Sequence, residues 1–379
     1  MSELIIRPVV TKADLKTFIR VTELVYKDDP AFIQPLMLER LESLSKDKNP
    51  YFLHAEGEYW IAERDGIAVG RISAQVDPTV QEKWGPDLGH FGLFEATDFE
   101  AAEALFKTAA GWLKAKGMKR IQGPWSLSAN QECGMLVKGF ETPPVVMMPH
   151  GRPEYDGWLK KLGFEKAKDL VAWYLDIKDE PEERIARIVE MGKRNKKIKI
   201  REIDMKRFNE ELDLILDIFN DAWADNWGFS PFTDAEAAHT AASLKPIVKP
   251  YRTFIAEYDG EAVGFMVTIP DVNHHIRDLK GKLFPFGIFK LLARMLGKKS
   301  DERVRVPLMG VRQSIQKSKV GGIIPIMLIE ATRPGVRKRG ATFAELSWIL
   351  EDNEGMNNML REVACVPYKT MRMYEKAID

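Results

Sequence analysis

The chain has 379 residues, which is too long for one ordinary hydrophobic core and predicts two domains. Apolar residues make up 45% and charged residues 30%, as in globular proteins, and the formal net charge of zero argues against a general nucleic-acid binder. With only two cysteines, Cys133 and Cys365, the composition argues against a disulfide framework and indicates a reducing compartment.

The N-terminal residues 1–8 do not show the charged and then apolar pattern of a signal peptide. No stretch of the sequence approaches the roughly 18 apolar residues that a membrane-spanning helix needs. We therefore expect a cytoplasmic protein that is soluble or peripheral at the inner face of the membrane.

The first half of the chain predicts a mixed series of helices and strands. Apolar residues recur at helical spacing over 12–44 and over Phe99–Lys116, where Gly117 supplies a C-cap. The other predicted elements are a hairpin at Tyr59–Gly70, strands at Phe91–Glu95, Arg120–Ser128 and Asp169–Ile177, and a helix at Glu154–Leu162.

The hairpin at Tyr59–Gly70 recurs at Thr253–Gly264. Each copy has an apolar strand, an Asp-Gly turn and a second apolar strand. Eight residues of the first copy reappear 194 positions later without a gap, namely Ile61, Ala62, Glu63, Asp65, Gly66, Ala68, Val69 and Gly70. Helical spacing over 206–246 precedes the second copy, as 12–44 precedes the first. This match in register predicts one fold present twice.

A charged helix is predicted over Pro181–Lys199, between the two halves. It includes the basic run Lys193–Lys197, which fits either a solvated helix face or a binding patch.

The second half contains an apolar insertion at Leu283–Leu296, bounded by Lys280, Lys282, Lys298 and Lys299. It is too short to span a bilayer. Three interpretations remain open: contact with a membrane surface through 283–297 with the lysines at the headgroups, a cover for an acyl chain, or an ordinary buried helix.

The last part of the chain predicts an anion pocket. A strand at Val304–Val311 precedes a basic, glycine-containing turn at Gln316–Gly322 and a helix at Ile323–Ala331. A second strand follows at Ala341–Ile349, and Tyr368–Tyr374 closes the segment. Because the amides and dipole of a helix N-terminus favour negative charge, we expect this turn to hold a pyrophosphate.

Two repeats with this order of elements resemble the GCN5-related N-acetyltransferase (GNAT) superfamily over nearly the whole chain. The resemblance implies a mixed α/β fold with two tandem GNAT-like domains, each a central mixed sheet flanked by helices. In that family a turn of the type Gln/Arg-x-x-Gly-x-Gly/Ala binds the pyrophosphate of coenzyme A. The nearest match here is Gln316–Gly321, which departs from the pattern because Lys319 replaces a glycine. The implied binding residues for acyl-CoA are Val311, Gln316, Lys317, Ser318, Lys319, Val320, Gly321, Gly322 and Asn353.

The first half lacks such a turn, and its corresponding link, Glu95–Glu103, is acidic and would repel a pyrophosphate. We therefore assign the cofactor to the second half. The expected domains are a degenerate GNAT-like domain at 1–180, a linker helix at 181–200 and an acyl-CoA-binding domain at 201–379.

Several short motifs resemble one branch of tandem bacterial acyltransferases, which is similar to the bacterial ceramide synthases. They include Gly123-Pro124 with Ser128, Asn130 and Glu132, then Asn226–Phe229, Pro270–Asn273, Glu345–Trp348, Leu350–Asn353 and Arg372–Tyr374. The resemblance implies transfer of a long-chain acyl group from acyl-CoA to an amine, such as a sphingoid base, without a metal. The residues that it implies for the acceptor are Ser128, Asn130, Trp227, Asn273 and Ser347.

Amide formation from a thioester needs a base for the amine and a proton for the thiolate. Glu345 is the first candidate for the base, because a carboxylate within an apolar strand must be paired or poised for chemistry. His274 and His275 are alternatives. Tyr368 and Tyr374 are candidates for the acid, although the family usually places its tyrosine in the helix after Asn353.

Two other functions remain open. Transferases that use aminoacyl-tRNA to build peptidoglycan have a similar tandem fold, and salt-sensitive tRNA binding would favour that class. A degenerate pair of domains that binds a lipid or a partner protein is the other alternative, and Lys319 in the turn favours it. The sequence does not fix the oligomeric state.

Overall fold

A computed structural model describes residues 3–178 and 180–378 of the chain. The chain forms two compact units. Among the described residues, unit 1 comprises residues 3–170, 276–288 and 369–378, and unit 2 comprises residues 171–178, 180–275 and 289–368.

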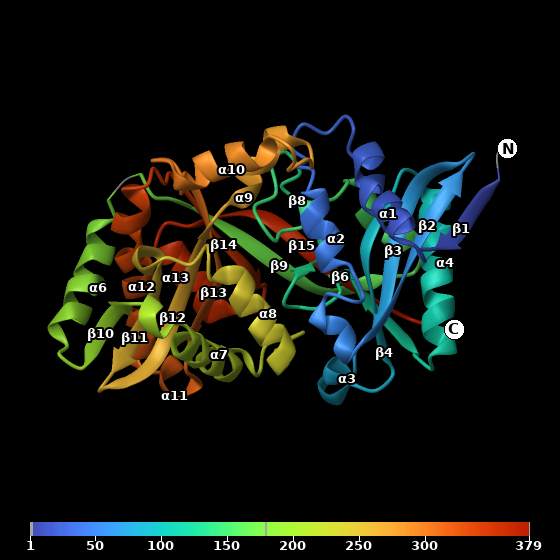
Figure 1. Cartoon of the computed structure of the whole chain (residues 1–379). Coiled ribbons are helices and arrows are strands. Elements are labelled where there is room, and N and C mark those ends of the chain that lie inside the picture. Colours follow the sequence, from blue (N-terminus) through green and yellow to red (C-terminus); the bar gives the residue numbers. More distant parts are fainter. Residues whose placement is uncertain (1–2, 179, 379) are drawn as a thin grey trace. The chain divides into compact units, whose positions relative to one another are not determined.

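Unit 1 consists of a sheet with helices on both of its faces (Figure 1). Its elements are β1 Leu4–Pro8, α1 Lys12–Val25, α2 Met37–Ser43, the 3-10 helix η1 Pro50–Leu53, β2 Glu56–Arg64, β3 Ile67–Val76, α3 Pro78–Trp84, β4 Leu88–Ala96, α4 Phe99–Ala115, β5 Arg120–Gly123, β6 Trp125–Ser126, β7 Glu132–Cys133, β8 Met135–Lys138, α5 Glu154–Lys161, η4 Arg277–Leu279 and most of β15 Val366–Ala377. The strand order is β1-β2-β3-β4-β5-β15.

Unit 2 repeats this plan. Its elements are the end of β9 Glu165–Asp176, α6 Glu183–Arg194, β10 Ile198–Glu202, η2 Met205–Arg207, α7 Phe208–Trp223, α8 Asp234–Leu244, η3 Pro250–Arg252, β11 Thr253–Tyr258, β12 Glu261–Pro270, α9 Val272–Ile276, most of α10 Gly287–Leu296, β13 Arg303–Val311, α11 Gln313–Gln316, α12 Lys319–Arg337, β14 Phe343–Leu350 and α13 Glu354–Glu362. The strand order is β10-β11-β12-β13-β14-β9, which matches that of unit 1.

The predicted hairpins are confirmed, and they agree in register. Ala62 pairs with Gly70 in β2–β3, and Ala256 pairs with Gly264 in β11–β12. In both hairpins the register shifts at the next residue, and the Asp-Gly turn has positive φ at both positions. Positive φ at both central residues is typical of the type I′ turn that suits twisted strands.

Each repeated glycine lets a helix approach the sheet. A Cβ on Gly70 would lie 2.8 Å from Leu105 of α4, and a Cβ on Gly264 would lie 3.2 Å from Ile324 of α12. Thus α4 and α12 cover equivalent faces of the two sheets. α7 covers the other face in unit 2, where a Cβ on Gly310 would lie 3.1 Å from Ala222.

The charged helix expected over 181–199 is α6, which ends at Arg194. The strand β10 begins at Ile198, so the last residues of the expected helix lie in a sheet. α6 belongs to unit 2 and lies against α12, and a Cβ on Gly192 would come within 2.3 Å of the Met327 sulfur. Lys193 and Lys197 pair with Glu190 and Asp259, which favours the solvated-face interpretation of the basic run.

The apolar insertion contains α10, in which only Gly287 is buried. Its interpretation as an ordinary buried helix is therefore wrong. Within the described residues, every helix is too short or too polar to cross a bilayer.

Candidate active site

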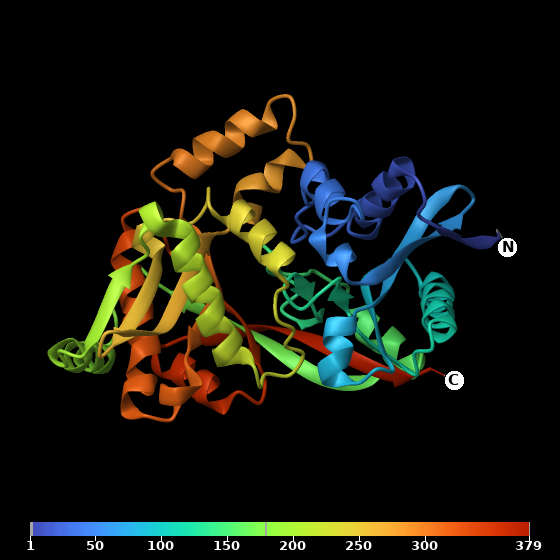
Figure 2. The same cartoon turned by 60° about the horizontal axis from the view of Figure 1, so that its bottom comes forward.

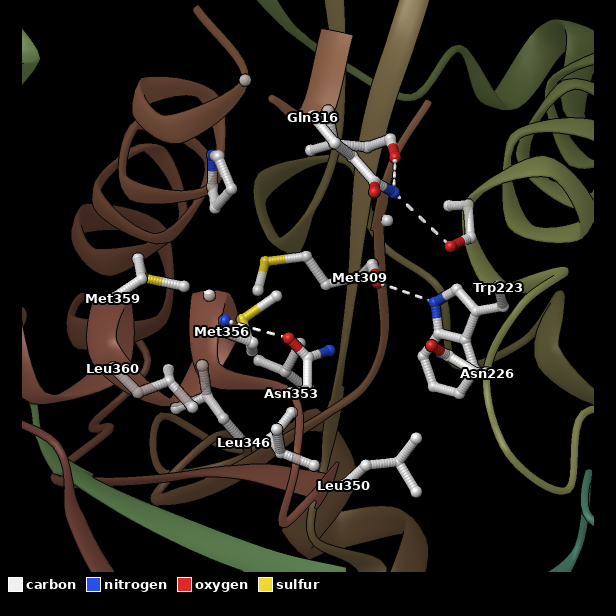
Figure 3. A pocket seen from close by; sticks show the side chains of 18 of the residues that line it. Trp223, Asn226, Met309, Gln316, Leu346, Leu350, Asn353, Met356, Met359 and Leu360 are labelled. Carbon is white, nitrogen blue, oxygen red and sulfur yellow. Dashed lines mark hydrogen bonds between the residues drawn. The ribbon is translucent and has the colours of Figure 1, made fainter. Parts of the chain in front are cut away.

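The candidate site of unit 2 lies where β13 and β14 part. Parallel pairing runs from Arg303–Phe343 to Val306–Leu346 and ends there. A cavity of about 390 Å³ opens beyond this last pair, between the strands and beside α7, α12 and α13 (Figure 3). A ligand in this cavity would lie between two diverging strands, within reach of their free backbone groups.

The cavity wall is largely apolar. Its side chains include Trp223, Met309, Leu346, Leu350, Met356 and Met359. The indole N–H of Trp223 donates to the carbonyl of Met309 at 3.2 Å, which ties α7 to β13. Thioether side chains adapt to irregular apolar ligands, so this wall suits a flexible hydrocarbon or pantetheine chain.

The expected turn at Gln316–Gly322 is shorter than predicted, because α12 begins at Lys319. Ser318 is the N-cap, and its hydroxyl accepts a hydrogen bond from the Gly321 amide at 3.1 Å. The first-turn amides of a helix have no partner within the helix and carry its positive dipole end. The basic residues Lys317 and Lys319 therefore flank a helix N-terminus that already favours an anion.

Most of the predicted acyl-CoA contacts lie at this cavity. Val311, Gln316, Lys317, Gly321, Gly322 and Asn353 line it, while Ser318, Lys319 and Val320 form the adjoining first turn of α12. The Gln316 amide donates to the Val311 carbonyl at 2.7 Å, which fixes the turn to the end of β13. Asn353 lines the cavity, and its side chain also accepts a hydrogen bond from the Met356 amide at 3.1 Å as the N-cap of α13.

The corresponding place in unit 1 is filled by the chain itself. β4 pairs with β5 from Leu88–Arg120 to His90–Gln122, and the following residues, including β6, continue beside β4. A Cβ on Gly92 would lie 1.7 Å from the Trp125 carbonyl oxygen, and Gln75 donates to that oxygen at 2.7 Å. The gap between the parting strands is therefore occupied by backbone.

The link before α4 in unit 1 also differs from that in unit 2. Only Thr97 and Asp98 separate β4 from α4. Asp98 caps the helix by accepting from the Ala101 amide at 3.0 Å and pairs with Arg64 at 2.7 Å. A carboxylate thus already holds the N-terminus that would have to receive a phosphate.

A buried charge cluster surrounds Glu345 on β14. Glu345 is fully buried, and the Ser347 and Tyr368 hydroxyls donate to its two carboxylate oxygens. Arg305, its ladder partner on β13, places Nε 3.9 Å from Glu345 Oε1 and donates to Ser347 Oγ at 3.1 Å. The carboxylate is therefore both paired with an arginine and held by hydroxyl donors, as a buried charge requires.

Ser347 connects this cluster to the cavity. It lines the cavity, and its hydroxyl donates a hydrogen bond to Glu345, which lies two residues earlier on the same face of β14. Burial, followed by the negative charge of Glu345, raises the pKa of Tyr368 well above its ordinary value. Tyr368 therefore stays protonated and keeps its hydrogen bond to the carboxylate.

The other candidate catalytic residues lie elsewhere. His275 is buried with Nε2 2.9 Å from the Ser300 carbonyl, and His274 has Nε2 4.0 Å from Glu302. Burial lowers the pKa of His274. Neither ring belongs to the described lining of the cavity. Tyr374 lies in unit 1, where its hydroxyl donates to Asp156 at 2.6 Å, so it does not join the Glu345 cluster.

The residues expected at the acceptor are dispersed. Ser347 lines the cavity, and Asn226 lines it in place of its predicted neighbour Trp227. Asn273 lies in α9 of unit 2. Ser128 and Asn130 lie in unit 1, where the Asn130 amide donates to the Ser128 hydroxyl at 3.3 Å.

Sequence reasoning missed Arg305 as a partner of Glu345. The signal was present, because Arg305 interrupts the apolar run between Val304 and Val306 just as Glu345 interrupts its own strand. Trp223, Met356 and Met359 were also missed, because helical spacing does not show whether an apolar side chain faces a core or a cavity.

The described residues contain neither a cluster of metal-ligand side chains nor an exposed thiol. Among residues 3–178 and 180–378 there is no group of three or more His, Cys, Asp or Glu that could hold a metal ion. Cys133 and Cys365 are both buried, and burial raises the pKa of Cys365 to about 12. The Cys365 thiol is therefore protonated at neutral pH.

The chain is similar to two curated bacterial proteins over its full length. It is 45% identical to protein YghO of Escherichia coli strain K12 over 99% of this chain and 95% of that one. It is 42% identical to the bacterial ceramide synthase of Caulobacter vibrioides over 100% of this chain and 98% of that one. No protein-family model matches the chain.

Solved structures share the fold at low sequence identity. A tandem GNAT protein from the clavulanic acid biosynthesis pathway superposes with a TM-score of 0.59 at 11% identity, over 100% of this chain and 99% of that one. A GCN5-related N-acetyltransferase from Sphaerobacter thermophilus gives 0.56 at 12% identity, over 99% and 96%. The predicted tandem GNAT fold is confirmed.

Proposed function

We propose that this chain, which has a tandem GNAT fold and belongs to the family of the Caulobacter bacterial ceramide synthase and protein YghO, moves a long-chain acyl group from acyl-CoA to a lipid amine. The acceptor in this proposal is a sphingoid base, which would give a (dihydro)ceramide. The Caulobacter relative carries the name of such an enzyme.

One observation carries the proposal. The cavity between β13 and β14 joins an anion-favouring helix N-terminus to an apolar, methionine-containing wall, with Ser347 and Glu345 at the point where the strands part. The pyrophosphate would lie at the first turn of α12, and the pantetheine and acyl chain would follow the apolar wall. The thioester would then lie near Ser347.

Glu345 is the proposed base, acting through Ser347. The Ser347 hydroxyl would take a proton from the attacking amine while it gives its own proton to Glu345. The nitrogen–carbon bond forms and the carbon–sulfur bond breaks, and the proton that Glu345 has received returns through Ser347 to the leaving thiolate. Tyr368 and Arg305 are positioning residues in this scheme, because they hold the carboxylate and the hydroxyl in place.

A long-chain amine partitions into bilayers, so the proposal includes a peripheral position of the enzyme at the cytoplasmic, inner face of the membrane, with contact through residues 283–297. The basic run Lys193–Lys197 gives little support to the tRNA-dependent alternative, since Lys193 and Lys197 are paired with carboxylates.

The test has two stages. In the first, the thermal midpoint of the protein is measured with coenzyme A, acetyl-CoA and palmitoyl-CoA, since a ligand that binds the folded state raises it. We expect the largest rise with palmitoyl-CoA, and its loss in a Gln316→Ala/Lys319→Glu variant. In the second, palmitoyl-CoA is incubated with sphinganine or with glucosamine, and N-acyl products are measured by mass spectrometry. Acylation of glucosamine alone would reject the lipid acceptor, and no rise with any thioester would reject the acyl-CoA site.

A further inference from the structure

The segment around α10 exposes an unusual number of large apolar side chains. Five of the thirteen exposed large hydrophobic side chains in the described residues fall within residues 284–296. They are Phe284, Phe286, Phe289, Leu292 and Leu296, with exposed fractions of 65%, 74%, 69%, 49% and 80%. Clustered exposed apolar groups mark an interaction surface, whereas single ones are ordinary.

These side chains form one surface on the helix and the loop before it. Phe289, Leu292 and Leu296 follow the i, i+3, i+7 spacing of a single helix face. The buried Gly287 holds the helix start against its own loop, because a Cβ there would lie 2.6 Å from the Lys282 carbonyl oxygen. Figure 2 shows α10, in orange, with no strand or helix over its outer side. We call Phe284–Leu296 the apolar surface.

Lysines bracket the apolar surface on both sides. Lys280 and Lys282 precede it, Lys298 and Lys299 follow it, and all four are exposed. The stretch 277–299 contains seven basic residues and one acidic residue, although the whole chain has no net charge. Within the described residues these four lysines form no ion pair, unlike Lys193 of α6 and Lys197 in the turn after it.

We propose that the apolar surface inserts into the interface of an anionic phospholipid bilayer, with the four flanking lysines at the headgroups. A helix of ten residues is about 15 Å long, which suits a position in the plane of the interface rather than across it. Aromatic and leucine side chains would enter the acyl boundary, and lysine stems would reach back to the lipid phosphates. The positive charge at both ends favours a bilayer over an uncharged apolar partner. The biological purpose of this contact rests on the proposed function, because membrane binding would bring the enzyme to an amine that is dissolved in the bilayer.

The test measures binding of the full-length protein to vesicles, without acyl-CoA. Protein is floated with vesicles of phosphatidylcholine alone or of phosphatidylcholine and phosphatidylglycerol at 7:3, in 0.1 M and 0.5 M NaCl. We expect binding to the anionic vesicles, and weaker binding at high salt because the charge contribution is screened. Binding should fall roughly fivefold for each lysine replaced in a Lys282→Gln/Lys298→Gln variant.

Matched variants test whether vesicle binding depends on the apolar surface itself or on exposed apolar and basic side chains in general. Phe286→Ser/Phe289→Ser/Leu296→Ser should lose vesicle binding. Val10→Ser/Ile67→Ser changes side chains of unit 1 that are 81% and 57% exposed and should retain it. Lys193→Gln/Lys197→Gln changes paired lysines and should also retain it. Circular dichroism checks that each variant is folded.

Two results would overturn the inference. Equal flotation of wild type and the triple serine variant would remove the apolar surface from membrane binding. A concentration-dependent dimer that the triple serine variant abolishes would assign the surface to a second copy of the chain. The proposed function fails separately, if no palmitoyl-CoA turnover occurs with a detergent-dispersed amine while vesicle binding is intact.

Discussion

The Glu345 cluster shows why a charged residue within an apolar strand signals a site. Glu345 and Arg305 are ladder partners on β14 and β13, and both are almost completely buried. Removing both charges from water is costly, and the hydrogen bonds from Ser347 and Tyr368 offset part of that cost. An apolar pair is often at least as stabilising, so stability alone does not account for the cluster, which is consistent with the proposed catalytic role of Glu345.

A first prediction at this scale concerns the base. Glu345→Gln keeps the shape of the side chain but cannot accept a proton, and we expect kcat to fall about 10²- to 10⁴-fold. Binding of palmitoyl-CoA should persist, since Glu345 does not line the cavity. Steady-state kinetics and thermal shift are measured together. The exposed carboxylate variant Glu351→Gln is the control, and an unchanged kcat in Glu345→Gln would remove Glu345 from the mechanism.

The two tyrosines of β15 give a second, paired prediction. Tyr368→Phe removes a donor to a charged group, worth about 1.5–3 kcal/mol, so we expect kcat/KM to fall about 10- to 100-fold. Tyr374→Phe removes only the bond to Asp156, and should cost about 1 kcal/mol of stability with kcat retained. A larger loss of kcat/KM in Tyr374→Phe than in Tyr368→Phe would instead assign the acid–base role to Tyr374.

At the scale of elements, the start of α12 decides what the unit can bind. Gly321 is buried where the end of α11 approaches the helix, and Gly322 beside it faces open space. The helix begins at Lys319 because Ser318 caps it, so the lysine that replaces the family glycine lies in the first helical turn. Lys319 needs no positive φ there, which explains how the departure from the family pattern is tolerated.

Adjacent glycine variants provide a third prediction. A Cβ at position 321 would lie 2.1 Å from the Ile315 carbonyl oxygen, so Gly321→Ala must displace the turn and should lower the free energy of unfolding by about 1–3 kcal/mol. A Cβ at position 322 meets nothing within 4 Å, so Gly322→Ala should be neutral or stabilising by up to about 1 kcal/mol. Urea unfolding measures both variants. Equal destabilisation would mean that the approach of Ile315 does not constrain the turn.

At the scale of the whole molecule, the duplication extends to charged contacts. Arg7 pairs with Glu63 at 2.5 Å and with Asp14 at 2.7 Å, and Arg201 pairs with Glu257 and Glu211 at the same distances. These networks hold β1 and α1 to the hairpin of unit 1, and β10 and α7 to the hairpin of unit 2. The copies differ instead at the parting strands, where unit 2 has a cavity and unit 1 has its own backbone.

Unit 1 contains a buried carboxylate with consequences for stability, which give a fourth prediction. Glu95 accepts from Tyr26 at 2.6 Å and Tyr155 at 2.9 Å, and lies 3.8 Å from Arg71, yet burial raises its pKa from 4.5 to about 7. Between these two pH values the folded state holds a proton that the unfolded state has lost. Stability should therefore fall as pH rises from about 4.5 to 7, by up to about 3 kcal/mol from this group.

The measurement compares wild type with Glu95→Gln, which stays neutral at every pH. Chemical denaturation at pH 5, 6, 7 and 8 gives the free energy of unfolding of each protein. As pH rises, the free energy of unfolding of the variant should increase relative to that of wild type. A difference that is independent of pH would show that Glu95 is ionised throughout this range in the folded protein.

The sequence by itself determined the repeat, and with it the fold. Eight identities in register predicted the two hairpins, and the family resemblance predicted the tandem GNAT architecture and a set of proposed acyl-CoA-binding residues, most of which lie beside one cavity. Local patterns sufficed because hairpin turns, helix caps and apolar periodicity depend on neighbouring residues.

Only the tertiary structure decided which residues meet. It joined Glu345 to Arg305 and Tyr368, separated Tyr374 from them, and placed β15 in the sheet of unit 1 and the end of β9 in that of unit 2. It also exposed the apolar face of α10. These outcomes depend on strand partners and helix neighbours that are far apart in the sequence. The spacing of apolar residues along a helix is the same whether its apolar face meets a core, a cavity or solvent.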